Sequence, residues 1–236
     1  MTTIEDSNKR GMVVVAHADD AEWGCSGTVA KLCDEGWEMV YVLCTDGSKG
    51  IDDPKISSDE LIRIRETEQT NAGKVLGLHE VVFLGYEDAM LQPTLDLRRD
   101  IAKQIRRYCP DLVICQNPAR DLVGRGYIGH PDHFAAGEAT LSAIYPTARD
   151  RLTFPELLSE GLEPHKVKEL WIMDRQNADQ YVDVTDYIEV AVSALRAHAS
   201  QVEYDDAEKY LKGWRSEIGS EVGFQYAEAF KRFVLG

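Results

Sequence analysis

The chain has 236 residues, 41 acidic against 26 basic side chains, and a formal net charge of −15. An acidic chain without a block of Lys or Arg argues against nucleic acid, or an anionic membrane surface, as the main partner. No run approaches the roughly twenty apolar residues of a membrane span, and the polar amino terminus lacks the apolar core of a signal peptide, so we expect a cytoplasmic protein.

The first element that we expect is a short strand ending in residue types that bind metals. Residues 12–15 are a Val-rich apolar run, typical of a parallel strand buried on both faces, and His17, Asp19 and Asp20 follow it. The loop beyond the carboxyl end of such a strand is the usual ligand site of open α/β sheets. The spacing of His17 and Asp20 can aim an imidazole and a carboxylate at one point, and both are common zinc ligands. Alternatively, the two aspartates only cap the helix that follows.

Helices and strands then alternate along the chain. Their periodicity predicts helices over 24–35, 57–76 and 95–108, and strands over 39–44, 81–85 and 111–116. Such units with short connections favour an α/β fold with a Rossmann-like, doubly wound, mostly parallel sheet flanked by helices, and an active site at the carboxyl ends of the strands. We expect a single domain over 1–236, with its core at 11–145 and a smaller carboxy-terminal part, 146–236, that completes the site and the sheet.

Two further polar positions could line this edge of the sheet. Asp46 follows the second strand in a polar loop, where it either lines the site or forms a turn. Arg65 and Glu68 share one face of the second helix, at the ordinary spacing of a surface ion pair. On spacing alone, the surface pair is the simpler interpretation of Arg65.

The fourth strand is followed by a second polar cluster, His130, Asp132 and His133. The proline between them suits the first turn of a helix, and Asp132 suits its positive amino end. The preceding loop, 117–129, is long and contains Tyr127, and loops of this kind often contact substrate. Because parallel strands bring their carboxyl ends to one edge, we expect the two clusters to converge.

The carboxy-terminal part is less regular than the core. We expect a strand over 169–173 and helices over 185–197 and 205–217, while 226–234 fits a strand or a helix equally well. His198, near the end of one of these helices, is more often a helix cap than a metal ligand. Whether it reaches the site is left open.

Together the two clusters can build a catalytic metal centre. The expected ligands are His17, Asp20 and His133, three protein ligands that leave coordination positions open, as in catalytic zinc sites. A bound cation acidifies water, and Asp19 is placed to take the proton of that water. On the opposite side His130 can stabilise the oxyanion and protonate the departing nitrogen, while Asp132 orients its ring.

These motifs resemble those of a known family. The motif Ala16-His17-x-Asp19-Asp20, followed by His130-Pro131-Asp132-His133, is similar to the paired motifs of the LmbE-like, or PIG-L, deacetylases. The resemblance extends to the Thr45-Asp46-Gly47 loop, the Arg65-x-x-Glu68 helix and residues 195–201, and so covers nearly the whole chain. It implies a zinc-dependent hydrolase that removes the acyl group from the amide of an N-acetylglucosamine unit.

The resemblance also implies roles for single residues. By position it makes His17, Asp20 and His133 the metal ligands, Asp19 the general base, and His130 the acid or oxyanion partner with Asp132 behind it. Arg65 matches an arginine that contacts the sugar, and Asp46 and Tyr127 are further candidates for substrate binding. Ala18 stands where a proline is usual. Tyr127 lies one place further from the second motif than the mobile tyrosine of some thiol-sugar deacetylases, so that oxyanion role is not transferred to it. A homo-oligomer, either a trimer or a hexamer, is also implied.

Several alternatives stay open at this point. The resident metal is Zn²⁺, or else Fe²⁺ or another divalent ion, because availability can decide between them. The substrate is a free sugar, a short chitooligosaccharide or a sugar conjugate, including a sugar thiol. Two histidines and a carboxylate also suit an iron(II) oxygenase, although that centre usually lies in a β barrel and needs no carboxylate base. A non-catalytic carbohydrate or metal-binding module is the remaining reading.

Overall fold

The computed structural model describes residues 9–120, 122 and 128–235 and is built around a seven-stranded sheet with the order β3-β2-β1-β4-β5-β7-β6. The strands are β1 (Arg10–Val15), β2 (Glu38–Thr45), β3 (Glu80–Tyr86), β4 (Leu112–Gln116), β5 (Glu169–Met173), β6 (Gln180–Asp183) and β7 (Ala227–Val234). Strands β1 to β5 pair in parallel, and β7 runs antiparallel to both β5 and β6. The predicted fold class, a mostly parallel sheet flanked by helices, is confirmed.

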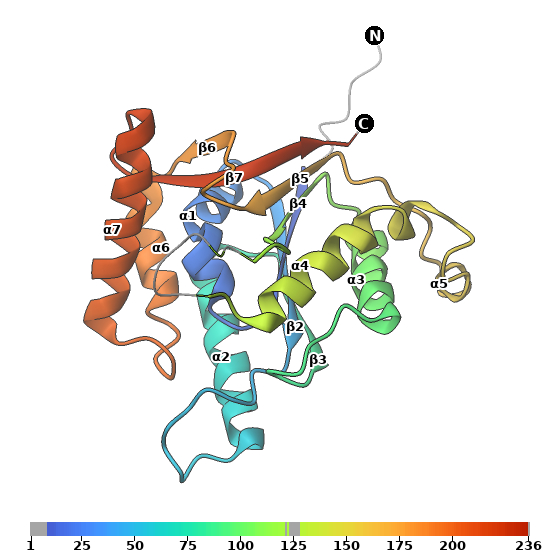
Figure 1. Ribbon diagram of the computed structural model, residues 1–236, viewed down its shortest axis with the longest axis horizontal. Coiled ribbons are helices and arrows are strands. Elements are labelled where there is room, and N and C mark those ends of the chain that lie inside the picture. Colours follow the sequence, from blue (N-terminus) through green and yellow to red (C-terminus); the bar gives the residue numbers. More distant parts are fainter. Residues whose placement is uncertain (1–8, 121, 123–127, 236) are drawn as a thin grey trace.

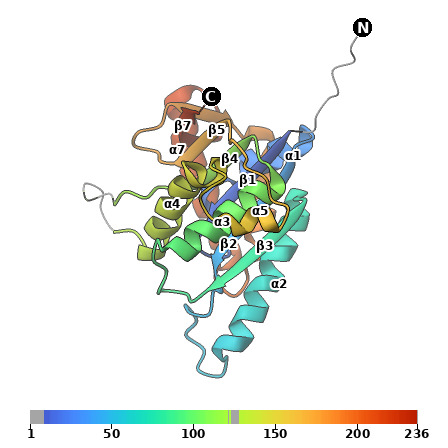
Figure 2. The same cartoon turned by 90° about the vertical axis from the view of Figure 1, so that its right-hand side faces the viewer.

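Helices cover both faces of the sheet (Figure 1). One face carries α1 (Asp20–Asp34), α2 (Ser58–Leu76) and α6 (Ile188–Leu195), and the other carries α3 (Leu95–Tyr108) and α4 (Pro131–Ile144). Helix α7 (Tyr204–Val222) packs on α6, and α5 (Glu156–Ser159) and two 3₁₀ turns, Thr147–Arg149 and Thr185–Tyr187, lie in connections. Figure 2 shows α2 projecting beyond the sheet, with the loop from β2 at its far end. Within the described chain, no helix is long and apolar enough to cross a membrane.

The central strand explains why the first apolar run is so uniform. In β1, Met12 and Val14 face the core cluster beneath α3 and α4, whereas Val13 and Val15 face the cluster beneath α1 and α2. All four side chains are completely buried. A strand covered on both faces needs apolar residues at every position, so an unbroken run replaces the usual alternation.

Local sequence signals placed most of the core elements correctly. Helix α2 begins where the Ser57 side chain accepts a hydrogen bond from the backbone N–H of Glu60, and it ends at Gly77, whose φ of 80° is left-handed. Helix α3 and strand β5 have the predicted bounds. Residues 227–234 form a strand because they pair with β5 and β6, which is a tertiary effect.

Other elements differ from the expectation. Helix α1 begins at Asp20 rather than at 24, since the polar cluster itself supplies its first turn. Residues 185–197 form a 3₁₀ turn and then the shorter helix α6. Strand β6 was not predicted, because its four residues are only partly buried and carry no clear apolar pattern.

Helix α1 is interrupted at Cys25, and a buried carboxylate accepts the backbone N–H groups that the interruption leaves free of helical partners. Cys25 has non-helical angles (φ −153°, ψ 16°), so the second half of α1 begins with backbone N–H groups that lack helical partners. The Glu228 carboxylate accepts the N–H groups of Gly27 and Thr28 at 3.1 and 2.8 Å. It also accepts the Nε–H of Arg215 at 2.9 Å. Strand β7 therefore caps an internal helix start in the element that carries Asp20.

Removing this carboxylate should be strongly destabilising. Glu228 is 1% exposed and Arg215 is 5% exposed, so Glu228→Ala leaves a buried guanidinium and two buried N–H groups without their acceptor. We expect the free energy of unfolding to fall by about 3–5 kcal/mol in urea denaturation. The matched control is Glu221→Ala, which breaks the exposed pair with Arg175 and should cost about 1 kcal/mol or less. Equal losses in the two variants would contradict a special role for Glu228.

Candidate active site

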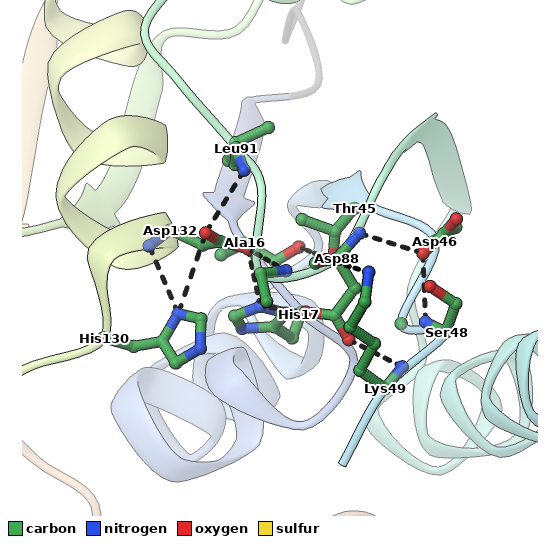
Figure 3. A network of polar contacts seen from close by, with 12 residues as sticks. Ala16, His17, Thr45, Asp46, Ser48, Lys49, Asp88, Leu91, His130 and Asp132 are labelled. Atoms are coloured by element: carbon green, nitrogen blue, oxygen red, sulfur yellow. Dashed lines mark hydrogen bonds and ion pairs between the residues drawn. The ribbon is translucent and has the colours of Figure 1, made fainter. Parts of the chain in front are cut away.

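The candidate site lies at the connection between β1 and α1 and at the first turn of α4. His17 follows β1, and His133 lies in the first turn of α4, so the sheet brings together residues that are 116 positions apart. Figure 3 shows His17 between Asp132 and Asp88, with His130 beside it. The site therefore forms at the carboxyl edge of the sheet, where the alternating pattern led us to expect it.

Three of the side chains predicted as metal ligands face one another. Nδ1 of His17 lies 3.3 Å from Oδ2 of Asp20 and 3.3 Å from Nε2 of His133. Nε2 of His133 lies 3.0 Å from Oδ1 of Asp20. The Asp20 carboxylate is anchored by the backbone N–H of His17 at 2.7 Å. Two imidazole nitrogens and a carboxylate thus converge, which is a donor set that suits zinc and similar ions.

The other nitrogen of His17 faces two buried carboxylates. Its Nε2 lies 3.0 Å from Oδ1 of Asp88 and 3.3 Å from Oδ2 of Asp132. Asp132 is fixed by the backbone N–H groups of Ala89 and Leu91 at 2.8 and 3.3 Å. Carboxylates in this position commonly hold the distal N–H of a metal-binding histidine and leave its other nitrogen free to coordinate.

Two further sets of side chains could hold a cation. Ligand atoms lie within 4.8 Å of one another in the set His17, His130, His133 and in the set His17, Asp88, Asp132. Both sets share His17 with the predicted one. The sets differ in whether Asp20, His130 or the Asp88–Asp132 pair completes the site.

The buried carboxylates of the site favour a positive charge beside them. Burial opposes the charged form of His17, but hydrogen bonds to Asp20 and Asp88 raise its pKa from 6.5 to about 10. Burial likewise opposes ionisation of Asp20, yet the charge and hydrogen bond of His133 hold the pKa of that carboxyl far below its ordinary value. A divalent cation would supply that positive charge, so the donors present fit a metal.

Asp19 is not a helix cap in the described chain. It occupies the N-cap position of α1 in a left-handed conformation, φ 85°, and its side chain makes no capping hydrogen bond. Burial, and next the charge of Asp20, raise the pKa of Asp19 to about 7. The Asp20 carboxylate accepts from the backbone N–H of His17, so neither aspartate caps α1 through a side-chain hydrogen bond, although Asp20 does lie in the first turn of the helix as expected.

His130 flanks the same cluster from the start of α4. Its Nδ1 accepts the backbone N–H of Asp132 at 3.2 Å and lies 3.9 Å from the Asp132 carboxylate. Its ring stands edge-on to that of His17, with the centroids 4.7 Å apart. Burial and the neighbouring His17 lower the pKa of His130. An Nδ1 that accepts a backbone hydrogen leaves Nε2 as the nitrogen that carries a proton in the neutral ring.

Arg65 is a buried residue and not a partner of Glu68. Its guanidinium donates to the backbone carbonyls of Ala18 at 2.9 Å and of Gly47 at 3.3 Å, and it lies 3.7 Å from Asp88. Glu68 accepts hydrogen bonds from a different segment, at Ser200. The surface ion pair is therefore wrong, and Arg65 joins the first and second βα loops behind the cluster.

The remaining candidates fall into different places. The Asp46 carboxylate accepts the backbone N–H groups of Ser48 and Asp88, so it shapes the loops (Figure 3). His198 is completely buried and lies 3.3 Å from Glu22, away from the ligand cluster. Tyr127 lies outside the described residues.

Asp88 is the site residue that the sequence reasoning missed. It follows β3, as the predicted clusters follow β1 and β4, so the same rule about carboxyl ends of parallel strands could have found it. The residues around it, Glu87 and Ala89, gave no motif that would single it out. Its 5% exposure and its contact with His17 are tertiary properties.

A cavity of about 520 Å³ adjoins the ligand cluster. Asp20 and His133 are among its lining residues, together with the apolar side chains of Trp23, Phe134 and Met173. A volume of this size is typical of sites for small molecules. The cavity can therefore hold a small substrate beside a cation bound by Asp20 and His133.

Known proteins share both the motifs and the fold. Residues 12–144 match the family model described as PIG-L, GlcNAc-PI de-N-acetylase. The diacetylchitobiose deacetylase of Thermococcus kodakarensis is 32% identical over 97% of this chain and 84% of that protein. A probable N-acetyl-alpha-D-glucosaminyl L-malate deacetylase 2 of Bacillus anthracis is 29% identical over 80% of each chain.

A solved structure agrees with these sequence matches. The N,N'-diacetylchitobiose deacetylase from Pyrococcus horikoshii, complexed with an inhibitor, superposes with a TM-score of 0.88 at 28% identity, over 97% of this chain and 85% of that one. The family model covers more than half of the sequence, and the Thermococcus relative matches nearly all of it. The chain therefore belongs to the PIG-L family of deacetylases, hydrolases that cleave a linear amide.

Proposed function

We propose that this deacetylase is zinc-dependent and removes the acetyl group from an N-acetylglucosamine unit of a small, uncharged molecule, such as a short chitooligosaccharide. The observation that carries the proposal is the convergence of His17, Asp20 and His133 beside an uncapped Asp19 and a flanking His130. This combination provides cation ligands, a base and an acid within one cluster, which amide hydrolysis needs.

In this proposal His17 binds the metal through Nδ1 and His133 through Nε2, with Asp20 as the third ligand. These are the nitrogens that face each other and the carboxylate. A bound divalent ion would lower the pKa of water to about 7 and polarise the amide carbonyl. Asp88 and Asp132 accept the Nε2–H of His17, which keeps Nδ1 available for coordination.

The protein's own groups move the protons. Asp19 takes a proton from the attacking water, because its carboxylate is not engaged as a cap and its pKa is raised to about 7. His130 acts as the acid in its imidazolium form: Nε2–H gives its proton to the amine nitrogen as the carbon–nitrogen bond breaks, which leaves a neutral ring, and the Asp132 carboxylate, 3.9 Å from Nδ1, favours the charged form. Acetate and the free amine are the products. Arg65, which lies 3.7 Å from Asp88, and the loop shaped by Asp46 would support the sugar side of the site from behind the cluster.

The substrate class rests on the relatives and on the charge of the chain. The relatives' names share an N-acetylglucosamine unit joined to a second sugar, to malate or to inositol. A net charge of −15 disfavours the dianionic malate conjugate, and the apolar cavity wall suits a sugar ring. A conjugate of N-acetylglucosamine with malate or inositol is the second candidate, in line with the names of two relatives, and a sugar thiol rests on the resemblance of the motifs alone. We also propose a homo-oligomer, trimer or hexamer, on family resemblance alone.

The proposed ligand set can be tested against the histidine set. We expect Asp20→Asn and His133→Ala to bind Zn²⁺ at least about tenfold more weakly, because the first replaces a charged oxygen ligand by a neutral amide and the second removes a coordinating nitrogen. His130→Ala should keep close to one equivalent after dialysis, as measured by inductively coupled plasma mass spectrometry. Loss of zinc in His130→Ala together with full retention in Asp20→Asn would favour His17, His130 and His133 as the site.

The activity can be tested by acetate release. The zinc-loaded protein should deacetylate diacetylchitobiose faster than N-acetylglucosamine linked to malate or inositol, and chelation should abolish turnover. Asp19→Asn should lower kcat about 10²–10⁴-fold with zinc still bound, because the base is lost. The control is Asp53→Asn, an exposed loop aspartate whose change should leave kcat intact.

Three results would contradict parts of this proposal. Full turnover by Asp19→Asn would remove Asp19 as the base. Turnover of the malate conjugate alone would overturn the preference for an uncharged substrate. Silence on all three compounds with zinc bound would favour the non-catalytic binding module.

A further inference from the structure

Three fully buried polar side chains lie beneath Asp19, outside the ligand cluster. They are Glu22 of α1, Gln69 of α2 and His198, which follows α6, and each is 0% exposed. Gln69 accepts the backbone N–H of Asp19 at 3.2 Å through Oε1 and donates to Oε1 of Glu22 at 3.0 Å through Nε2. Oε2 of Glu22 lies 3.3 Å from Nε2 of His198. The chain of contacts ends at Asp19.

The backbone of Asp19 is in a conformation that needs support. Its φ of 85° is left-handed, a region that residues with a side chain adopt rarely. Its carboxylate does not support this conformation by capping α1. The contact that fixes its N–H is the amide oxygen of Gln69. Strain of this kind persists where the surroundings hold it, and it is common at functional sites.

Hydrogen-bond chemistry fixes which way the Gln69 amide points. A backbone N–H only donates hydrogen bonds, so the oxygen of Gln69 must face Asp19, and this leaves its NH₂ group to face Glu22. Nε2 of His198 lies beside the second oxygen of Glu22, and neither atom has a hydrogen-bond partner among the described residues, so this contact is an electrostatic one. In an apolar core these three side chains would be costly and unnecessary. The hydrogen bond of Gln69 connects this group to Asp19, the residue that we assign as the base.

We propose that Gln69 is a positioning residue, fixed by Glu22 and His198, that holds the backbone of Asp19 in the left-handed turn from which its carboxylate reaches the attacking water. This inference rests on the proposed function. Gln69 itself touches no substrate. Its loss should change the rate of the chemical step and leave the metal ligands and substrate binding in place.

Three variants separate positioning from general stability. Gln69→Met has nearly the same length but cannot accept the Asp19 N–H. Glu22→Gln keeps an acceptor for the Gln69 NH₂ group, and it serves as the control. The double variant Glu22→Gln, Gln69→Glu exchanges the two side chains and so keeps the net charge. Its carboxylate at position 69 accepts from the backbone N–H of Asp19 and from the amide at position 22. Only the hydrogen bond between positions 22 and 69 changes direction.

We expect kcat of Gln69→Met to fall about tenfold to a hundredfold, with KM and bound zinc unchanged. Glu22→Gln and the double variant should stay within about threefold of the wild type. A second readout needs no turnover: in the metal-free protein, amide hydrogen exchange at residues 17–20 should speed up in Gln69→Met and not in the double variant. Urea denaturation of all three variants controls for lost stability.

Different results would contradict the positioning role of Gln69 and the assignment of Asp19 as the base. If Gln69→Met keeps its kcat and its exchange protection, or if the double variant is as slow as Gln69→Met, the positioning role is wrong. If Asp19→Asn turns over normally, the assignment of the base fails, whatever the Gln69 variants do.

Discussion

His17 lies between two groups of carboxylates, and the positive charge that this arrangement requires is the constraint on which the site depends. Asp20 faces one ring nitrogen, and Asp88 and Asp132 face the other. In water such charges would be screened, but here they are buried and must be balanced locally. A proton balances them poorly for catalysis, because it occupies the nitrogen that a metal would use. The buried carboxylates that raise the pKa of His17 therefore also favour a bound cation.

The topology explains why so few elements are enough to build this cluster. Strand β1 lies between β2 and β4, and the loops that follow these parallel strands meet at one edge. His17, Asp46 and His133 thus come from separate βα connections yet belong to one neighbourhood. Arg65 links the first two connections by donating to their carbonyls, which makes the loops one unit. The strands therefore set the positions of the site residues, and the hydrogen-bonded loops set the orientations of their side chains.

The sequence was most informative where a local pattern and a topological rule agreed. His17, Asp20 and His133 could be placed together because each lies at the end of a strand or the start of a helix in an alternating chain. Arg65 could not be interpreted correctly from spacing, since its burial comes from loops that fold over α2. Glu22 and Gln69 belong to no motif in the sequence, and the position of His198 favoured a helix cap. Their burial depends on how the segment after α6 packs on α1 and α2, which no short-range signal records.

The capped interruption of α1 has a consequence for anyone who shortens or fuses this chain. Glu228 belongs to the last strand, yet it supplies the acceptor on which the second half of α1 begins. A truncation that removes β7 lies some two hundred positions beyond α1 in the sequence. It would nevertheless disturb α1, the helix that begins with Asp20, because it removes the Glu228 carboxylate. Fusion partners and affinity tags are therefore better attached before β1 than spliced into β7, and libraries that vary the carboxy-terminal strand should keep position 228 fixed.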